Sequence, residues 1–162
     1  KRIRNTPFRI TADENFDKVI ECCASTPRND QGGTWITQRM QSAYLELFQQ
    51  GVAHSIEVWQ DDKLVGGLYG IALGRMFFGE SMFSHSPDAS KVAFYHLQQH
   101  LLAEHYSLID CQMMNPHLET LGVHPMTRTE FLARLRTNRD KPTKIGPWTW
   151  RPAATASADN ER

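Results

Sequence analysis

Three strand-like segments in a row, followed by a helix and one further strand, constrain the fold of this chain more than any other feature. Residues 54–60 (HSIEVWQ) alternate in polarity, residues 61–63 (DDK) predict a turn, and residues 64–73 (LVGGLYGIAL) predict the returning strand of a hairpin. A turn at Gly74 leads into a third strand predicted within residues 74–84 (GRMFFGESMFS). The pattern predicts three antiparallel strands.

A helix connects these strands to the next one. Residues 86–106 open with a helix N-cap signal and carry apolar residues at helical spacing. The predicted buried side consists of Ala93, Phe94, Leu97, Leu101 and Leu102. Residues 107–115 (SLIDCQMMN) follow as a strand. Because a strand–helix–strand crossover of this length places its strands parallel and adjacent, we expect strands 74–84 and 107–115 to be neighbours.

Two helices precede the sheet, after a first strand expected at residues 6–11. The first helix is predicted over residues 11–26 and the second over residues 37–51. Thr37 is expected to cap the second helix and Gly51 to end it. Their apolar faces consist of Phe16, Val19, Ile20 and Cys23, and of Met40, Tyr44, Leu47 and Phe48.

The remaining segments complete the predicted fold. Residues 127–138 predict a short amphipathic helix, residues 146–152 a strand at the edge of the sheet, and residues 153–162 a disordered polar tail. At 162 residues the chain fits one domain, which we place at residues 1–152. The order of elements predicts an α+β fold, a mixed sheet flanked by helices as in N-acetyltransferase-like (GNAT-like) folds.

Polar side chains stand where the sheet is expected to be apolar. Glu80 interrupts the run FFGESMF, and Asp110 and Gln112 end a strand that begins with apolar residues. An unpaired buried carboxylate is costly, so these groups are either paired or reach solvent. Because side chains alternate along a strand, residues 110 and 112 are expected on one face of the sheet. Two interpretations stay open at this point: a reactive cleft, or polar caps at strand ends.

Glycines and apolar residues surround these polar positions. Four glycines thin the predicted sheet, either at β-bulges or where a ligand comes close. The nearby apolar residues either line a pocket or belong to the core. The glycines are Gly66, Gly67, Gly70 and Gly79, and the apolar residues are Trp35, Leu68, Phe94, Leu97 and Ile109.

Several classes of protein are disfavoured. The seven histidines show no spacing typical of a metal site, so no metal is expected. An acetyl-coenzyme A enzyme would need a glycine-rich loop at residues 84–90, which read SHSPDAS, so a donor other than coenzyme A is predicted. The three cysteines predict free thiols, which suit a reducing cytoplasm. No apolar run approaches the roughly 18 residues of a membrane span.

Charge is balanced overall but not along the chain. Basic residues number 18 and acidic residues also 18. The first nine residues contain four basic residues and no acidic one, and residues 128–151 contain seven basic residues against two acidic ones. Patches of this kind either contact the phosphates of a polyanion such as RNA or form ordinary solvated surface.

A set of motifs in fixed order makes the chain similar to a known family. The motifs GTWIT, HSIEVW, LVGGLYGIALG, FFGESMFS, ASK and LIDCQ resemble those of the bacterial leucyl/phenylalanyl-tRNA–protein transferases, from about residue 7 to residue 135. The resemblance implies transfer of leucine or phenylalanine from tRNA to the N-terminal Arg or Lys of a protein, which marks it for degradation under the N-end rule. It also implies a GNAT-like catalytic domain in the cytoplasm, with aminoacyl-tRNA as substrate and no cofactor.

The resemblance assigns roles to residues, motif by motif. Asp110 and Gln112 correspond to the catalytic pair, and Glu80 to the residue that receives the basic side chain of the acceptor. Arg4 and Arg9 are expected to contact the tRNA backbone. The donor pocket is expected to comprise Trp35, Leu68, Gly79, Phe94, Leu97, Leu101 and Ile109. The family often has methionine where this chain has Leu68, a swap that keeps a pocket apolar while altering its shape.

Two other functions stay open. The family has a smaller N-terminal domain before this region, and the sequence is expected to lack it. Without that domain, the chain would be a non-catalytic tRNA- or degron-binding module. A peptidoglycan-type aminoacyl transferase would use the same kind of donor but prefer the amine of a cell-wall precursor as acceptor.

Overall fold

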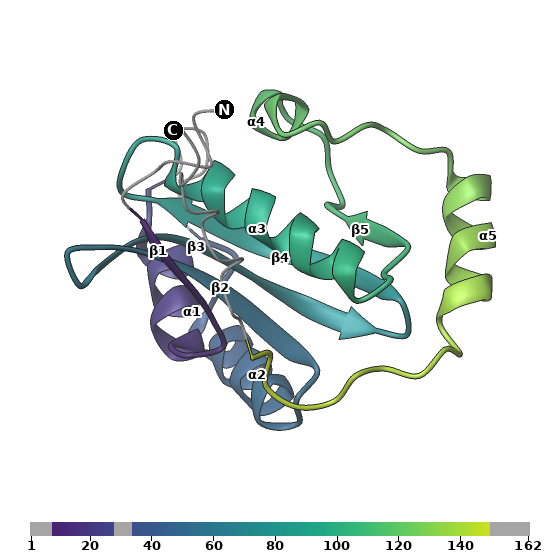
Figure 1. Ribbon diagram of the computed structural model, residues 1–162, viewed down its shortest axis with the longest axis horizontal. Coiled ribbons are helices and arrows are strands. Elements are labelled where there is room, and N and C mark those ends of the chain that lie inside the picture. The colour runs from purple at the N-terminus through teal and green to yellow at the C-terminus, as the bar shows by residue number, and fades with distance from the viewer. Residues whose placement is uncertain (1–7, 28–33, 150–162) are drawn as a thin grey trace, which may run out of the picture.

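The mixed sheet predicted from the sequence is present. The computed structural model describes residues 8–27 and 34–149. Five strands form one sheet in the order β1-β2-β3-β4-β5 (Figure 1). The first four strands pair antiparallel, whereas β4 and β5 pair parallel, as the crossover predicts. The strands are β1 (Arg9–Ala12), β2 (Ala53–Gln60), β3 (Lys63–Leu73), β4 (Met76–Ser84) and β5 (Leu108–Asp110).

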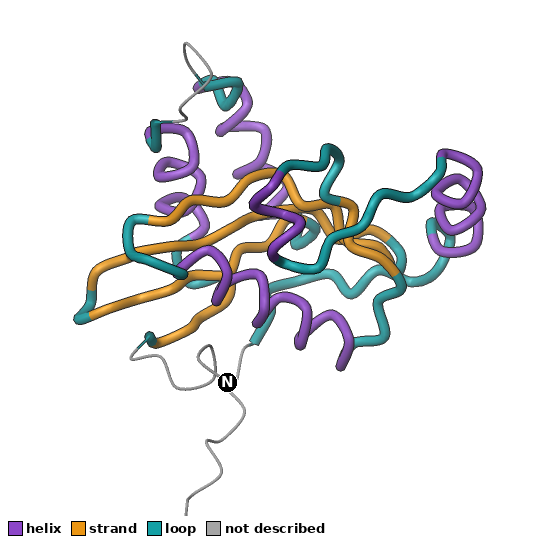
Figure 2. The backbone as a smooth tube through the Cα atoms, turned by 90° about the horizontal axis from the view of Figure 1, so that it is seen from above, coloured by secondary structure: helices purple, strands orange, loops and turns teal. Residues whose placement is uncertain are grey.

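Helices cover both faces of the sheet. The helices α1 (Phe16–Ser25) and α2 (Gln38–Gln49) lie on one face, and the crossover helix α3 (Ala89–Ala103) lies on the other (Figure 2). Two further helices follow β5, α4 (Pro116–Thr120) and α5 (Arg128–Asn138), and α5 lies to the side of the sheet (Figure 1). The short helix α4 was not predicted from the sequence.

Each face of the sheet has its own apolar core. On one face, Phe94 and Leu97 of α3 pack with Leu68 of β3. On the other, Phe16 of α1 packs with Tyr69 of β3. Consecutive residues of β3 serve opposite cores because side chains alternate along a strand. The predicted stripe of α1 is confirmed, since Phe16, Val19, Ile20 and Cys23 are its buried residues.

Local sequence signals account for several boundaries. The side chain of Thr37 accepts a hydrogen bond from a backbone N–H of α2, as an N-cap should. Thr127 and Glu130 form a capping box at the start of α5. The turn between β2 and β3 places Asp61 and Asp62 at positive φ, as the favoured two-residue hairpin turn requires. These features confirm the second helix, the last helix and the hairpin.

Two helix details were wrong. The first helix begins at Phe16 rather than at residue 11, because residues 11 and 12 pair with β2 and Asp13 has a φ of 58°. Leu102 was expected on the buried side of α3, yet 67% of its surface is exposed. The face of α3 that meets the sheet instead includes Val92, which is fully buried.

The strand predicted at residues 146–152 was also wrong over the part that the structure describes. Residues 146–149 have no strand pairing, and Gly146 has a φ of 108°. Trp148 donates its backbone N–H to the side chain of Asp13 at 2.6 Å instead of to a neighbouring strand. Residues 150–152 and the predicted tail at 153–162 lie outside the described residues.

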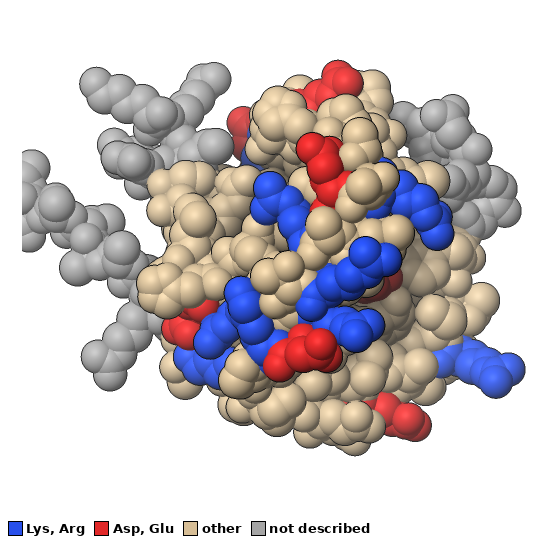
Figure 3. Space-filling view, turned by 90° about the vertical axis from the view of Figure 1, so that its right-hand side faces the viewer, with Lys and Arg blue, Asp and Glu red and all other residues tan. Residues whose placement is uncertain are grey.

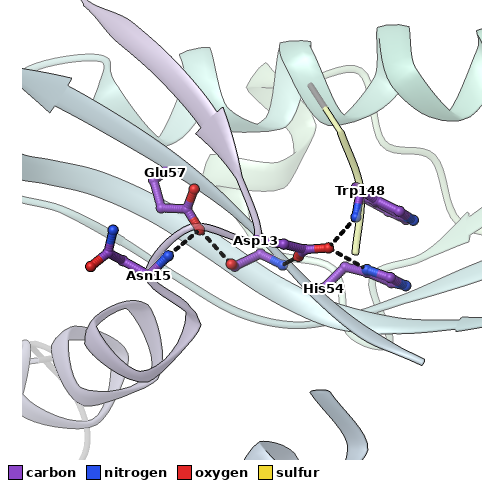
Figure 4. A network of polar contacts seen from close by, with 6 residues as sticks. Asp13, Asn15, His54, Glu57 and Trp148 are labelled. Carbon is purple, nitrogen blue, oxygen red and sulfur yellow. Dashed lines mark hydrogen bonds and ion pairs between the residues drawn. The ribbon is translucent and has the colours of Figure 1, made fainter. Parts of the chain in front are cut away.

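A buried polar network connects this last segment to β2 (Figure 4). Oδ2 of Asp13 lies 2.8 Å from Nδ1 of His54 as well as accepting the bond from Trp148. The indole ring of Trp148 stacks on the His54 ring, with 4.0 Å between centroids. Next to them Glu57 accepts hydrogen bonds from the hydroxyl of Thr11 and the hydroxyl of Ser55, both at 2.5 Å. The network therefore provides hydrogen-bond partners for two buried acids, Asp13 and Glu57. It also holds the last loop in place, so that Trp148 packs into the core on the α3 face of the sheet.

Candidate active site

The candidate site lies where β4 and β5 part. These parallel strands share only three residue pairs, and the last joins Phe78 to Asp110. The strand β5 ends at Asp110, whereas β4 continues to Ser84. A cavity of about 310 Å³ opens beside this unpaired part of β4. Its wall brings together Glu80 from β4 and Gln112 from the segment after β5, but Asp110, which was expected to converge with them on one cleft, does not line it.

A β-bulge explains why Glu80 stands inside a strand. Tyr69 pairs with Ser81 and Gly70 pairs with Gly79, so Glu80 is the extra residue, without a partner on β3. A bulge bends its strand and re-aims a side chain, and bulges are common next to active sites. The carboxylate therefore reaches the cavity instead of taking a regular place in the sheet.

The two glycines at this bulge, Gly70 and Gly79, differ in how much space their surroundings leave for a side chain. A Cβ on Gly70 would come within 2.5 Å of the Phe77 ring and closer still to the carbonyl oxygen of Phe78. A Cβ on Gly79 would have its nearest neighbour, the carbonyl oxygen of Asp110, at 3.6 Å. Gly70 is thus needed for close approach of two strands, whereas Gly79 leaves open space on the cavity wall.

Glu80 has one hydrogen-bond partner in the described part of the chain. The hydroxyl of Tyr44, from α2, donates to Oε2 of Glu80 at 2.7 Å. Burial, and then the hydrogen bond and charge of Glu80, raise the pKa of Tyr44 far above its usual range. The phenol therefore stays protonated and remains a donor. Sequence reasoning placed Tyr44 on an apolar helix face and missed this contact.

Gln112 lies beyond the end of β5. Its φ is 62°, so the alternation argument that placed residues 110 and 112 on one face of the sheet was wrong. Instead, Oδ1 of Asp110 accepts a hydrogen bond from the backbone N–H of Gln112 at 2.8 Å. Aspartate commonly binds the backbone two residues ahead in this way and stabilises a turn. The Asp110 carboxylate thus fixes the point from which the Gln112 side chain departs.

The two residues of the predicted catalytic pair share one cavity but not the other. Asp110 lines a second cavity of about 420 Å³ between the end of β5 and α5, and Gln112 lines both cavities. Cys111 also lines both cavities and packs against the α3 core. Burial, and to a lesser extent the charge of Asp110, raises the pKa of Cys111 to about 11. The thiol is therefore a poor nucleophile at neutral pH.

Most of the predicted donor pocket is brought together by the fold. Six of its seven residues line the first cavity: Trp35, Leu68, Gly79, Phe94, Leu97 and Ile109. Leu101 lies one turn further along α3 and lines a separate, smaller cavity. Three polar residues of the wall, Ser81, Asn115 and His117, were not predicted as site residues. Asn115 caps α4 by accepting a hydrogen bond from Leu118 N at 2.9 Å, a helix-start signal that could have been read in the sequence.

Arg9, one of the two residues predicted to contact tRNA, lines neither of these two cavities. Arg9 lies on β1, at the opposite edge of the sheet from β5, within 3.8 Å of Glu14 and over the ring of Trp59. Arg4 is outside the described residues. Basic side chains gather on the face where α5 lies, which belongs to the second basic stretch of the sequence (Figure 3). Of the basic residues there, Arg128 lines the second cavity together with Asp110 and Gln112.

Two features bear on broader classes of protein. Within residues 8–27 and 34–149, no group of three or more His, Cys, Asp or Glu side chains is arranged to hold a metal ion. Over the same ranges, no helix is both long enough and apolar enough to cross a membrane. Cys22, Cys23 and Cys111 all lie in these ranges, and none of them forms a disulfide there.

Solved structures of acetyltransferases have a similar fold. A possible acetyltransferase from Clostridium difficile matches with a TM-score of 0.55 at 10% identity, over 75% of this chain and 93% of that one. A ribosomal-protein-alanine N-acetyltransferase from Brucella melitensis matches with a TM-score of 0.52 at 12% identity, over 75% and 93% of the two chains. These similarities confirm the predicted GNAT-like fold, and at such identity they bear on the fold alone.

Sequence similarity identifies the family, which the structural similarity does not. The family described as leucyl/phenylalanyl-tRNA protein transferase matches residues 1–136. A leucyl/phenylalanyl-tRNA–protein transferase of Thiobacillus denitrificans is 51% identical over 93% of this chain and 65% of its own length. One from Pseudomonas fluorescens is 50% identical over 91% of this chain and 65% of its own length. The chain belongs to this family, as its motifs predict, and it spans slightly less than two-thirds of the length of these curated relatives.

Proposed function

We propose that this chain carries the catalytic domain of an enzyme that moves leucine or phenylalanine from aminoacyl-tRNA to the N-terminal Arg or Lys of proteins, in the cytoplasm and in the N-end rule pathway of degradation. The observation that carries the proposal is the first cavity. It joins an apolar wall to one carboxylate, that of Glu80, and to the side-chain amide of Gln112. The proposed reaction needs this combination. The apolar wall suits the donor side chain, the carboxylate suits the cationic side chain of the acceptor, and the amide can bind the reacting amine.

The apolar wall suits the donor side chain. Leu68, Phe94 and Leu97 come from a strand and a helix that pack together, so their positions are fixed by the core. Burial of a leucine or phenylalanine side chain contributes about 1.5–3 kcal/mol. Because one methylene more or less changes binding in such a pocket by only about 1–3 kcal/mol, discrimination between leucine, phenylalanine and methionine should be modest.

The reaction is aminolysis of an ester. The neutral α-amine of the acceptor attacks the aminoacyl carbonyl carbon, a C–N bond forms, and the C–O bond to the tRNA 3′-terminal ribose breaks. The amine loses one proton and the departing ribose oxygen gains one. We assign the Gln112 side-chain oxygen to accept a hydrogen bond from the attacking amine, which holds its lone pair toward the carbonyl. Since the ester is already activated, positioning can supply much of the rate.

Asp110 supports this step as a proton acceptor. An amide is too weak a base to keep the proton, so a carboxylate or water must receive it. The bond from Gln112 N–H occupies one oxygen of Asp110 and leaves Oδ2 for that purpose. Asp110 lines the second cavity, and we assign that cavity to the approach of water and the tRNA terminus.

A transfer assay tests the proposal. The chain is mixed with tRNA charged with radioactive leucine or phenylalanine and with a peptide that begins with Arg, and incorporation into the peptide is measured. The assay is repeated with the N-terminal third of the Thiobacillus denitrificans relative fused in front of the chain. We expect transfer that requires Arg or Lys at the peptide N-terminus. Absence of transfer in both forms would contradict the proposal, and preference for a cell-wall precursor amine would favour a peptidoglycan-type transferase.

A further inference from the structure

Tyr44 lies outside the predicted site, yet its side chain holds Glu80, a residue of that site, by a hydrogen bond. Tyr44 lies on α2 and is only 8% exposed. Its ring meets the Tyr69 ring edge-on at 5.1 Å, which fixes the direction of the hydroxyl. That hydroxyl donates to Oε2 of Glu80 at 2.7 Å. The donor is thus rigid and buried, whereas its acceptor faces a cavity.

The bulge makes such support necessary. As the extra residue in β4, Glu80 has no cross-strand neighbour to restrict it. A glutamate side chain loses more than most in rotamer freedom when it is ordered, so a mobile Glu80 would bind a cation at greater entropic cost. A fixed donor removes that cost before the ligand arrives. Within the described residues, the Tyr44 hydroxyl is the only hydrogen-bond partner of this carboxylate.

The other carboxylate oxygen remains for a ligand. Oε1 of Glu80 accepts no hydrogen bond from the part of the chain that the structure describes. A carboxylate has room for about four hydrogen bonds, and the tyrosine uses one. A guanidinium or ammonium group entering the cavity can therefore meet an oxygen whose direction is already set.

We propose that Tyr44 is a positioning residue for acceptor recognition: its hydroxyl holds Oε2 of Glu80 so that Oε1 meets the cationic side chain of the acceptor's N-terminal residue. This inference rests on the proposed function, since it takes the acceptor to be an N-terminal Arg or Lys. Tyr44 does not touch the reacting atoms. It should therefore affect the KM for cationic acceptors and leave kcat almost unchanged.

The matched probes are two peptides that differ only in charge. One begins with Arg and the other with citrulline, which has nearly the same shape but no charge. Initial rates of transfer from Leu-tRNA are measured against each peptide with whichever form of the chain is active, the chain alone or the fusion. The variants are Tyr44→Phe, Glu80→Gln and the double variant.

The control removes a buried hydroxyl elsewhere. Tyr106 is 9% exposed, and its hydroxyl has no hydrogen-bond partner in the described structure. Tyr106→Phe therefore tests the general effect of losing a buried phenol oxygen. Thermal unfolding of both Tyr→Phe variants shows whether either change perturbs the fold.

We expect Tyr44→Phe to raise the KM for the Arg peptide roughly tenfold, the usual effect of losing a hydrogen bond to a charged group. Its kcat should stay within about twofold of the wild type, its KM for the citrulline peptide should not change, and its effect should vanish in the Glu80→Gln background. An unchanged KM for the Arg peptide, or an equal rise for both peptides, would overturn the inference alone. If the wild type does not transfer to Arg peptides in either form, the proposed function fails, and this inference fails with it.

Discussion

Two glutamates stand in the middle of strands of this sheet, and their surroundings differ in one decisive respect. Glu57 on β2 is fully buried and accepts hydrogen bonds from Thr11 and Ser55, with Asn15 N 3.5 Å away. Glu80 on β4 is half-buried, has one donor and faces a cavity. A carboxylate whose two oxygens both accept hydrogen bonds inside the fold is structural, and one with an unused oxygen at a cavity can bind a ligand.

The two aspartates repeat the contrast. Asp13 has a side chain that is 1% exposed, and it binds His54, Ser55 N and Trp148 N. Asp110 accepts one backbone hydrogen bond and lines an open cavity. The end of the sheet at β1 and β2 is therefore a closed polar network, and the end at β4 and β5 is an accessible one. Five predictions test this contrast, and the one with the largest expected effect comes first.

Asp110→Ala should lower kcat for transfer about 100-fold, because it removes both the proton acceptor and the bond that fixes the turn at Gln112. The free energy of unfolding should change little, since the carboxylate is exposed to the second cavity. Asp110→Asn keeps an oxygen that can accept the Gln112 N–H bond and should recover part of the loss. A normal kcat in Asp110→Ala with only a weaker affinity for tRNA would refute the assigned role.

Glu80→Gln should lower kcat/KM for Arg and Lys peptides by about 10–100-fold, the range for losing a charge-assisted hydrogen bond. The citrulline peptide should be used as well as by the wild type. Steady-state kinetics with the two peptides gives the ratio directly. Equal losses for charged and neutral peptides would mean that Glu80 supports the pocket and does not recognise the cation.

Glu57→Gln should change the pH dependence of stability and leave acceptor selectivity alone. Burial raises the pKa of Glu57 above its ordinary value of 4.5, against the opposing hydrogen bonds from Ser55 and Thr11. The folded state therefore binds this proton more tightly than the unfolded state, and the free energy of unfolding falls as pH rises from 4.5 to the folded pKa. The loss is about 1.4 kcal/mol for each unit between the two pKa values.

The measurement for this variant is urea unfolding at a series of pH values. The glutamine cannot ionise, so the variant should lack the decline that Glu57 causes in the wild type. Curves that run parallel for the two proteins across this range would show that Glu57 does not titrate as its burial implies.

Gly70→Ala should lower the free energy of unfolding by about 1–3 kcal/mol, because the new Cβ overlaps the backbone and ring of the neighbouring strand. Gly79→Ala is its matched control and should cost less than about 1 kcal/mol, since its Cβ would enter open space. Urea unfolding compares the two. Similar losses at both positions would mean that the bulge relaxes and does not fix the course of β4.

Leu68→Met should produce the smallest effect, a change of a few-fold in the ratio of leucine to phenylalanine transferred. Volume-conserving apolar swaps usually cost less than about 1.5 kcal/mol, so the pocket should remain intact while its shape changes. Competition between Leu-tRNA and Phe-tRNA in one reaction measures the ratio. A large fall in total transfer would show that Leu68 has a role beyond lining the wall.

The sequence predicts the sheet well because its signals are local or follow a general rule. Alternation gives β2 and β3, and the parallel pairing of β4 with β5 follows from the crossover through α3. The bulge at Glu80 was only one of two interpretations of the glycines, because a shift in register depends on how two strands meet. Gln112 was misplaced because no periodic pattern predicts a left-handed residue.

The closed network was missed for a related reason. Glu57 occupies a polar position in an alternating strand, which predicts exposure, yet α1 and the loop before it cover that face. Trp148 lies 135 residues from Asp13 in the sequence, so their contact leaves no local pattern. Motif resemblance pointed to Glu80, Asp110 and Gln112, whereas Tyr44 resembled an ordinary apolar helix residue until its hydroxyl was placed.

The most direct test of the central claim locates the donor by nuclear magnetic resonance. The ligand is leucine joined by a stable amide to 3′-amino-3′-deoxyadenosine, which mimics the charged end of tRNA, and methyl signals of the protein are followed during titration. We expect shifts at Leu68, Leu97 and Ile109, which line the cavity beside β4. Shifts confined to Ala53 and Ile145, which line the hollow next to Asp13 and His54, would contradict it.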